Sequence, residues 1–145
     1  MIYLLDTNVV AEITTRPKPA PAVIARARSV PAPALYLSVI TIAEIEAGVR
    51  GTPDLVRRTA FDRALADIRG QYHDRIATVG EREALAYLAL HRRLKSAGTA
   101  GASIDPPDAL IAATALANDW TLVSRNIKHL ARSGALLLNP WEYEG

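Results

Sequence analysis

The chain has 145 residues, half of them hydrophobic and 22% charged, which predicts one globular domain over residues 1–145 with a substantial core. It has no cysteine, no apolar stretch near the roughly 20 residues of a membrane span and no basic, apolar leader, so we expect a cytoplasmic protein without disulfides, thiolate metal sites or membrane contact. A net charge of +2, with basic residues that are mostly Arg, weakly favours a polyanionic partner.

Short apolar runs alternate with segments of helical periodicity along the whole chain. Apolar runs bounded by polar residues are typical of parallel strands that are covered on both faces. In chain order we predict a strand at 2–5, helices at 9–15 and 22–29, a strand at 35–37, helices at 39–49 and 54–69, a strand at 76–79, helices at 81–96 and 106–118, and strands at 121–123 and 136–138. Strands that alternate with helices predict an α/β fold with a parallel sheet of four to five strands and helices on both faces.

The spacing of residues predicts the buried stripe of one helix and the end of another. The inward-facing stripe of the helix at 54–69 is expected to consist of apolar residues at helical spacing, namely Leu55, Ala60, Phe61, Leu65 and Ile68. The helix at 81–96 is expected to end at Gly98 and the small-residue loop that follows it.

An acidic residue stands where the first predicted strand ends. Asp6 follows the apolar run directly, and Thr7 and Asn8 come next. In open α/β sheets, ligands bind in the crevice beyond the carboxyl ends of the strands. Asp6 is therefore a candidate site residue, and its chemistry depends on which other groups converge on it.

The helix at 106–118 opens with two further acids. It is apolar nearly all round, which indicates a buried helix. Asp105 can cap it and Asp108 lies in its first turn, where free amides and the helix dipole favour a negative charge. That structural interpretation is complete by itself. The alternative is that Asp108 faces a site that holds a metal ion at the mouth of the helix.

Glu44 also has two interpretations. Thr41 and Glu44 have the spacing of a capping box, in which the Glu reaches back to the start of its helix. Because this helix directly follows the second strand, Glu44 can instead face the carboxyl edge of the sheet. Glu46 falls on roughly the opposite side of the helix and is expected to be solvated.

Ser124, Arg125 and Asn126 follow the fourth strand as Asp6 follows the first. A hydroxyl and an amide there can position a water or a phosphate, although both are also ordinary turn residues. Three carboxylates without Cys or a His pair suit Mg²⁺, or Mn²⁺ as a substitute. Such ions activate water and stabilise the charge that develops on a phosphodiester.

The chain resembles a PIN domain, specifically the VapC/FitB type of toxin ribonuclease from type II toxin–antitoxin systems. The resemblance runs almost end to end and rests on five segments in the family's order: LLDTNVVAE from residue 4, YLSVITIAEIEAGV from residue 36, PDALIAATALAND from residue 107, TLVSRN from residue 121 and LNPWEY from residue 138.

The resemblance implies a PIN-like three-layer α/β/α sandwich and an Mg²⁺-dependent endoribonuclease that acts as a toxin. It assigns the acidic metal site to Asp6, Glu44 and Asp108, and it implies a homodimer and a cognate antitoxin that blocks the site with a basic residue. Many relatives carry a fourth acid where this chain has Asn126, so the resemblance leaves one or two metal ions open.

The remaining candidates are supporting residues. Thr7, Asn8, Ser124 and Asn126 could act around the acids or on the substrate, and Arg125 is the candidate for a phosphate contact. We expect packing roles for Trp120 and Trp141 and a structural role for Glu12. His73, His91 and His129 are scattered in polar surroundings, so no catalytic role is expected for them.

The rival interpretation is a catalytically weak PIN-like module that binds RNA or a partner. A phosphatase of the haloacid-dehalogenase type is disfavoured, because it needs an acid at the position of Asn8.

Overall fold

The computed structural model describes residues 1–97 and 103–145. Within them, five strands form a single parallel sheet in the order β3-β2-β1-β4-β5, with β1 in the centre. The strands are β1 (Tyr3–Leu5), β2 (Leu35–Ser38), β3 (Ile76–Ala77), β4 (Thr121–Val123) and β5 (Leu136–Leu138). The chain builds outward from β1 through β2 to β3 and then returns to the other side of β1. The strand order therefore reverses at β1, which is where α/β sheets bind ligands.

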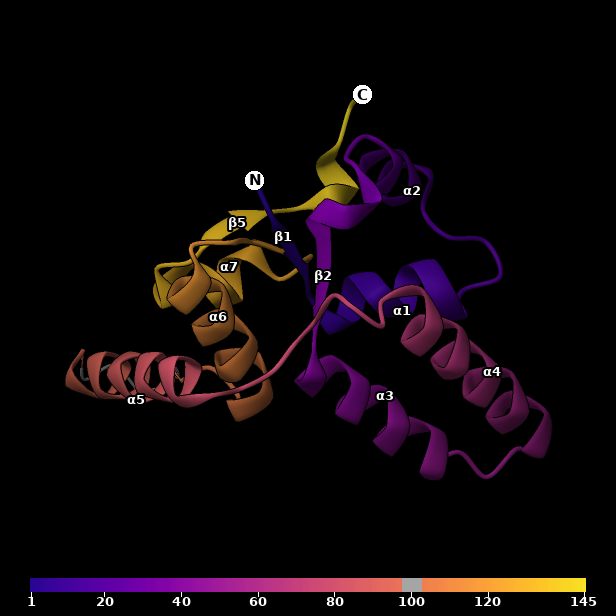
Figure 1. The fold of residues 1–145 in the computed structure, drawn as a ribbon, viewed down its shortest axis with the longest axis horizontal. Coiled ribbons are helices and arrows are strands. Elements are labelled where there is room, and N and C mark those ends of the chain that lie inside the picture. Colours follow the sequence, from indigo (N-terminus) through magenta and orange to yellow (C-terminus); the bar gives the residue numbers. More distant parts are fainter. Residues whose placement is uncertain (98–102) are drawn as a thin grey trace.

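Helices cover both faces of this sheet, which confirms the predicted three-layer α/β/α sandwich. They are α1 (Thr7–Thr15), α2 (Pro21–Arg28), α3 (Val39–Arg50), α4 (Leu55–Gln71), α5 (Glu81–Ser96), α6 (Pro106–Asn118) and the single turn α7 (Ile127–Leu130), with short 3₁₀ turns η1 (Ala32–Ala34), η2 (Ala131–Ser133) and η3 (Pro140–Glu142). Figure 1 shows α1 to α4 on one side of β1 and β2, and α5 to α7 on the other.

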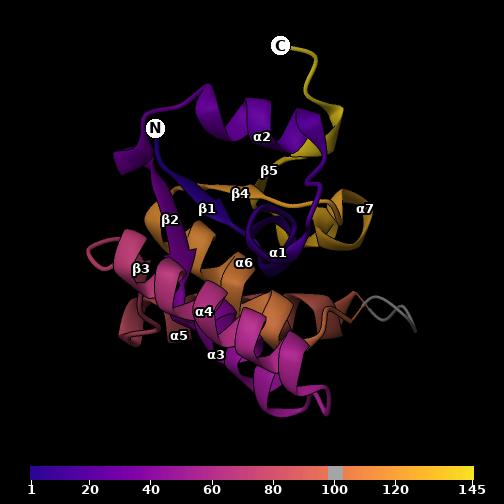
Figure 2. The ribbon, with the colours of Figure 1, turned by 90° about the vertical axis from the view of Figure 1, so that its right-hand side faces the viewer.

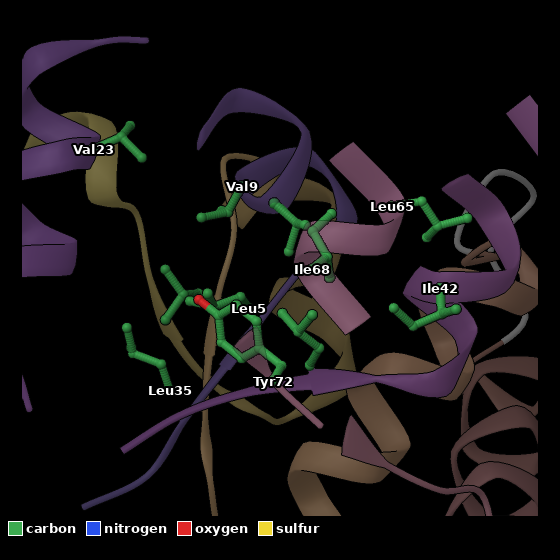
Figure 3. Close-up of a cluster of buried hydrophobic side chains, with 11 residues drawn as sticks. Leu5, Val9, Val23, Leu35, Ile42, Leu65, Ile68 and Tyr72 are labelled. Atoms are coloured by element: carbon green, nitrogen blue, oxygen red, sulfur yellow. The ribbon is translucent and has the colours of Figure 1, made fainter. Parts of the chain in front are cut away.

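The alternation of side chains along each strand creates two separate cores. In β1, Leu5 packs against the α1–α4 side, and its neighbour Leu4 packs against the α5–α7 side. β4 repeats the pattern with Val123 and Leu122. Figure 2 views the molecule from the α1–α4 side, and Figure 3 shows side chains of that core, from β1, β2 and the surrounding helices, pointing toward one another. Successive strand residues point to opposite faces, so each short strand serves both layers.

Several predicted boundaries were close and two details were wrong. The strand predicted at 76–79 spans only Ile76–Ala77. In α4, Leu65 and Ile68 are buried as expected, but Leu55 is 74% exposed and Ala60 is also exposed. The reason is that α4 contributes to the core only through its second half. The loop predicted at 98–101 lies outside the described residues, and no helix among residues 1–97 and 103–145 is long and apolar enough to cross a membrane.

Candidate acidic active site

Asp6 lies at the carboxyl end of the central strand and is only 3% exposed. It is the N-cap residue of α1, and its Oδ1 accepts a hydrogen bond of 2.8 Å from the backbone N–H of Thr7. Its Oδ2 accepts hydrogen bonds from Ser124 Oγ at 2.7 Å and from Asn8 Nδ2 at 3.3 Å. Burial raises the pKa of Asp6, while the hydrogen bonds from Ser124 and Thr7 oppose that rise. Neutral donors therefore hold this carboxylate in place, and no cationic side chain in the described part of the chain forms an ion pair with it.

The sheet register brings Ser124 to Asp6 across 118 positions of sequence. Leu5 pairs with Val123, so the residues that follow them leave adjacent strands at the same level. Ser124 is fully buried, and its hydroxyl also accepts a hydrogen bond of 3.1 Å from Asn8 Nδ2. Asn8 Oδ1 in turn accepts the backbone N–H of Arg125 at 3.2 Å. The two strand ends thus form one polar network around Asp6.

Glu44 reaches the site through Thr7 and not through a capping box. Ser38 caps α3 by accepting the N–H of Ile40, so of the two interpretations of Glu44 the capping box with Thr41 is wrong. Thr41 is instead buried inside the first turn, with its hydroxyl 3.0 Å from Thr7 Oγ1. Thr7 Oγ1 donates to Glu44 Oε1 at 2.7 Å. Thr7 therefore connects Glu44 to the residue next to Asp6.

Asp108 lies in the first turn of α6, with 28% of its side chain exposed. Its pKa is raised first by burial and then by the negative charges of Asp6 and Glu44, while His129 acts in the opposite direction. Coulomb effects of this kind require the three acids to lie near one another. Asp6, Glu44 and Asp108 therefore share one electrostatic neighbourhood, to which Asp105 makes a smaller contribution.

A divalent cation fits the chemistry of these donors. All are carboxylate oxygens, which Mg²⁺ and Mn²⁺ prefer, and their mutual repulsion is what a cation relieves. Among the described residues, no three His, Asp or Glu side chains already form a group compact enough to hold a metal ion. The carboxylates would therefore have to move closer together around an ion.

Of three other charged candidates, Asp105 departs from the expectation, Glu46 makes surface ion pairs and Glu12 has the expected role. Asp105 occupies the N-cap position of α6, but within the described residues its side chain makes no capping hydrogen bond. Glu46 forms ion pairs with Arg50 at 3.1 Å and Arg69 at 2.8 Å, so it is engaged on the outer side of α3. Glu12 accepts the backbone N–H of Ala20 at 2.9 Å, in agreement with the expected structural role.

The residues that follow β4 separate into buried and exposed ones. Ser124 is buried, whereas Arg125 and Asn126 are exposed. Asn126 donates its backbone N–H to Ser124 Oγ at 3.1 Å and begins α7. The guanidinium of Arg125 lies 4.9 Å from the ring centre of Trp141, so Trp141 supports a charged side chain at the rim of the site.

His129 is the site neighbour that sequence reasoning missed. Its Nε2 lies 3.9 Å from Asp108 Oδ2. The available signal was its place on a single helical turn that directly follows the Ser124–Asn126 segment, because this turn begins at the same edge of the sheet. His73 and His91 lie on exposed surface elsewhere.

An open groove runs alongside Thr7 and Glu44 between α1, α3 and α4. It is lined by small and apolar residues besides these two: Ala11, Thr15, Ile45, Gly48, Val49 and Phe61. A polypeptide segment in this groove would pass beside one of the three acids.

Comparisons with known proteins agree with this architecture. The model of the PIN domain family matches residues 3–134. The chain is 32% identical over 142 residues to the VapC ribonuclease Y4jK of Sinorhizobium fredii, covering 97% of this chain and 99% of that protein. It is 32% identical over 141 residues to Toxin FitB of Neisseria gonorrhoeae, with the same coverage. The crystal structure of FitAcB from Neisseria gonorrhoeae superposes with a TM-score of 0.87 at 30% identity, covering 97% of this chain and 99% of that one.

Proposed function

The chain belongs to the PIN domain family, and we propose that it is an Mg²⁺-dependent endoribonuclease of the VapC/FitB toxin type that hydrolyses RNA phosphodiester bonds. The observation that carries the proposal is the placement of the acids at the carboxyl edge of the sheet, where Thr7 donates hydrogen bonds to both Asp6 and Glu44, and where Asp108 lies near enough for their charges to raise its pKa. The names of the relatives, one a ribonuclease and one a toxin, support the same activity.

Each acid has a role in this proposal. Asp6 and Asp108 hold the metal ion, and Glu44 binds it or orients the attacking water. When bound, Mg²⁺, or Mn²⁺ in its place, lowers the pKa of a water and stabilises charge on the phosphodiester. Ser124 and Asn8 keep Asp6 in a fixed orientation, because each donates a hydrogen bond to its Oδ2.

The residues around the acids have three roles in this proposal: they orient Glu44, limit the number of metal ions and contact the substrate. Thr7 orients Glu44 through the hydrogen bond from its Oγ1. Asn126 supplies no negative charge, so we favour a single tightly held ion. Arg125 contacts an RNA phosphate: its guanidinium stacks over Trp141, which leaves the N–H groups in its plane free to reach a phosphate oxygen.

We further propose a cognate antitoxin protein as a partner, a cytoplasmic location and a homodimeric state. The groove beside Thr7 and Glu44 can receive an antitoxin segment. A basic residue on that segment would be attracted to the three acids, and it would compete with the metal ion for them.

The central test is RNA cleavage by the purified chain during an Mg²⁺ titration, with EDTA as the metal-free reference. Asp6→Asn and Asp108→Asn should each lower the cleavage rate by at least about 100-fold, since even groups that only support metal ligands contribute 10–100-fold. Circular dichroism should show an unchanged fold. An Asp6→Asn protein that still cleaved RNA at the wild-type rate would exclude the mechanism.

The chain offers matched controls for both acidic helices. Asp105 lies three residues before Asp108 at the start of α6, and Glu46 lies two residues after Glu44 on α3. Asp105→Asn and Glu46→Gln should retain cleavage within a few-fold of wild type, whereas Glu44→Gln should not. Equal losses in control and test variants would mean that general loss of charge, and not the site, explains the effect.

The second candidate is a catalytically weak PIN-like module that binds RNA or a partner. The neutral Asn126 at the rim of the site is the observation that favours it. Retention of RNA binding by a wild-type protein that shows no cleavage at any Mg²⁺ concentration would support this candidate over the enzyme.

A further inference from the structure

His129 brings a nitrogen donor to the acids, and the proposed mechanism does not use it. It lies on the single turn α7, and its Nε2 is 3.9 Å from Asp108 Oδ2. Within residues 1–97 and 103–145, His129 is the one basic side chain whose nitrogen lies within 4.0 Å of a carboxylate oxygen of Asp6, Glu44 or Asp108. The acidic site therefore has one imidazole at its edge.

The distance between His129 and Asp108 suits two ligands of one metal ion better than a hydrogen bond. An N–H···O hydrogen bond spans about 2.7–3.2 Å between its heavy atoms. Nitrogen and oxygen ligands lie about 2.0–2.2 Å from a small divalent ion, so two ligands of one ion are about 3 Å apart when adjacent and about 4 Å apart when opposite. The 3.9 Å between Nε2 and Oδ2 falls in this range.

The imidazole of His129 is available for such a bond. Neither of its ring nitrogens forms a hydrogen bond with another residue in the described part of the chain, and its contact with Asp108 is the only ion pair that it forms there. The side chain is 45% exposed, so water can accept the proton of the ring nitrogen that does not bind the metal ion.

We propose that His129 Nε2 is a ligand of the metal ion that Asp108 holds, and that this nitrogen makes the site prefer Mn²⁺ to Mg²⁺. The inference rests on the metal site of the proposed function and specifies its ion. Carboxylate oxygens suit Mg²⁺, Ca²⁺ and Mn²⁺, whereas imidazole is a ligand of transition metals. Mn²⁺ is the ion that satisfies both descriptions, because Mg²⁺ and Ca²⁺ are bound through oxygen.

A purely electrostatic role for His129 leads to the opposite result. Burial raises the pKa of Asp108, and the charge of His129 opposes that rise. If His129 acted only as a cation beside Asp108, it would compete with a metal ion, and its removal would tighten the binding of Mn²⁺ and Mg²⁺ alike. Removal of a ligand instead weakens the binding of Mn²⁺ and leaves that of Mg²⁺ nearly unchanged.

The first test is the dissociation constant of each ion for the full chain, measured by calorimetry in mildly alkaline buffer, because only neutral imidazole binds a metal ion. His129→Ala should weaken Mn²⁺ binding by at least about 10-fold, the lower end of the loss seen for groups that merely support ligands, and should change Mg²⁺ binding no more than a few-fold. Tighter binding of both ions, or an unchanged preference for Mn²⁺, would overturn the proposal.

Lys128→Ala is the matched control for charge. Lys128 precedes His129 on the same turn and is exposed. Its removal takes a positive charge from the edge of the site without removing a ligand, so the ratio of the two dissociation constants should stay at the wild-type value. A control that lost the preference for Mn²⁺ as His129→Ala does would contradict a role for the imidazole nitrogen.

The second test detects the bond between nitrogen and metal directly. Pulsed electron paramagnetic resonance of bound Mn²⁺ should show coupling to a nitrogen nucleus in wild type and none in His129→Ala. The chain has three histidines, so His73→Ala and His91→Ala complete the assignment and should both retain the coupling. A wild-type Mn²⁺ site without nitrogen coupling, or coupling that survives in His129→Ala, would exclude His129 as a ligand.

The outcomes separate this inference from the proposed function. A wild-type chain that binds neither ion would remove the metal site and the inference together. If Asp6→Asn and Asp108→Asn abolish binding of both ions while His129→Ala binds Mn²⁺ as wild type does, the acidic site stands and the nitrogen ligand is refuted. Neither measurement depends on RNA cleavage, so loss of the nuclease is not confused with loss of the ligand.

Discussion

At the scale of single residues, the site contains carboxylates that lie near one another, and neutral hydrogen-bond donors hold Asp6 in place. Asp6 receives hydrogen bonds from Thr7, Asn8 and Ser124, none of which carries a positive charge. These donors fix the carboxylate without neutralising it, so its negative charge remains available to a cation. The consequence is a folded state that carries unfavourable charge whenever no cation is bound.

The first prediction concerns the pH dependence of stability in EDTA. The pKa of Asp108 is raised above its ordinary 3.8 in the folded state. The folded state therefore binds this proton more tightly than the unfolded chain does. The contribution of this proton to the free energy of unfolding is complete below the pKa of Asp108 in the unfolded chain. It is lost as the pH rises through the pKa of Asp108 in the folded state.

Wild type should accordingly lose free energy of unfolding as the pH rises above about 4, by about 1.4 kcal/mol for each unit by which the folded pKa exceeds the unfolded one. Asp108→Asn should show a flatter profile, while Asp105→Asn should stay closer to wild type, because it removes only the smallest of the charges that raise the pKa of Asp108. Urea unfolding at several pH values measures this. Identical slopes for wild type and Asp108→Asn would contradict the charge coupling.

At the scale of elements, α6 shows how the fold presents an acid at the site. Ile111 and Ala112 are completely buried, because the helix lies between the sheet and α5. The first turn projects to the carboxyl edge and carries Asp108, while the other end closes at Asp119 in a left-handed conformation with φ of 55°. Both ends of this buried helix therefore carry an acid, and only the first is placed where a negative charge is favourable.

The second prediction follows from the C-terminal end of α6. Asp119→Gly should raise the free energy of unfolding by about 0.5–1 kcal/mol, since glycine adopts this backbone conformation without steric penalty and the acid leaves the negative end of the helix dipole. Asp119→Ala should be less stable than Asp119→Gly, because it keeps the steric penalty. Urea denaturation compares the three proteins; a glycine variant less stable than the alanine variant would refute the explanation.

At the scale of the whole molecule, the order of the strands decides which residues meet. β1 lies between β2 and β4, so the segments that follow these three strands emerge side by side. They deliver Asp6, the α3 segment with Glu44 and the Ser124 turn to the same edge, and α6 adds Asp108. The acidic neighbourhood is therefore a property of the sheet topology, because no two of its acids are close in sequence.

The third prediction concerns binding of the metal ion without reference to activity. Mg²⁺ that binds the folded state alone should raise the free energy of unfolding, by ~2.7 kcal/mol when its concentration is 100 times the dissociation constant. For a chain of this length, each kcal/mol added to the free energy of unfolding raises the melting temperature by roughly 2–4 °C or slightly more.

Thermal unfolding with and without Mg²⁺ measures this shift. Asp6→Asn and Asp108→Asn should lose most of it, while Asp105→Asn should retain it. A shift of the same size in all four proteins would indicate binding elsewhere on the surface.

By itself, the sequence determined the order of strands and helices, and it singled out the acids as candidates for a site. Apolar runs and helical periodicity are local patterns, so the elements emerged with boundaries shifted by a few residues. The position of Asp6 after a buried strand, and of Asp108 at the start of a buried helix, followed from the same patterns. The exposed start of α4 was predicted wrongly because Leu55 has the right spacing, but none of the described elements covers it.

The tertiary structure decided what each side chain contacts. Glu44 had the spacing of a capping box, yet Ser38 caps α3 and Glu44 binds Thr7 from another helix. Ser124 resembled a turn residue, yet it lies buried against Asp6. His129 was expected to have no role at the site, yet this exposed side chain approaches Asp108. The physical reason is that these contacts join residues far apart in the chain, and the sheet register that aligns them depends on all the strands together.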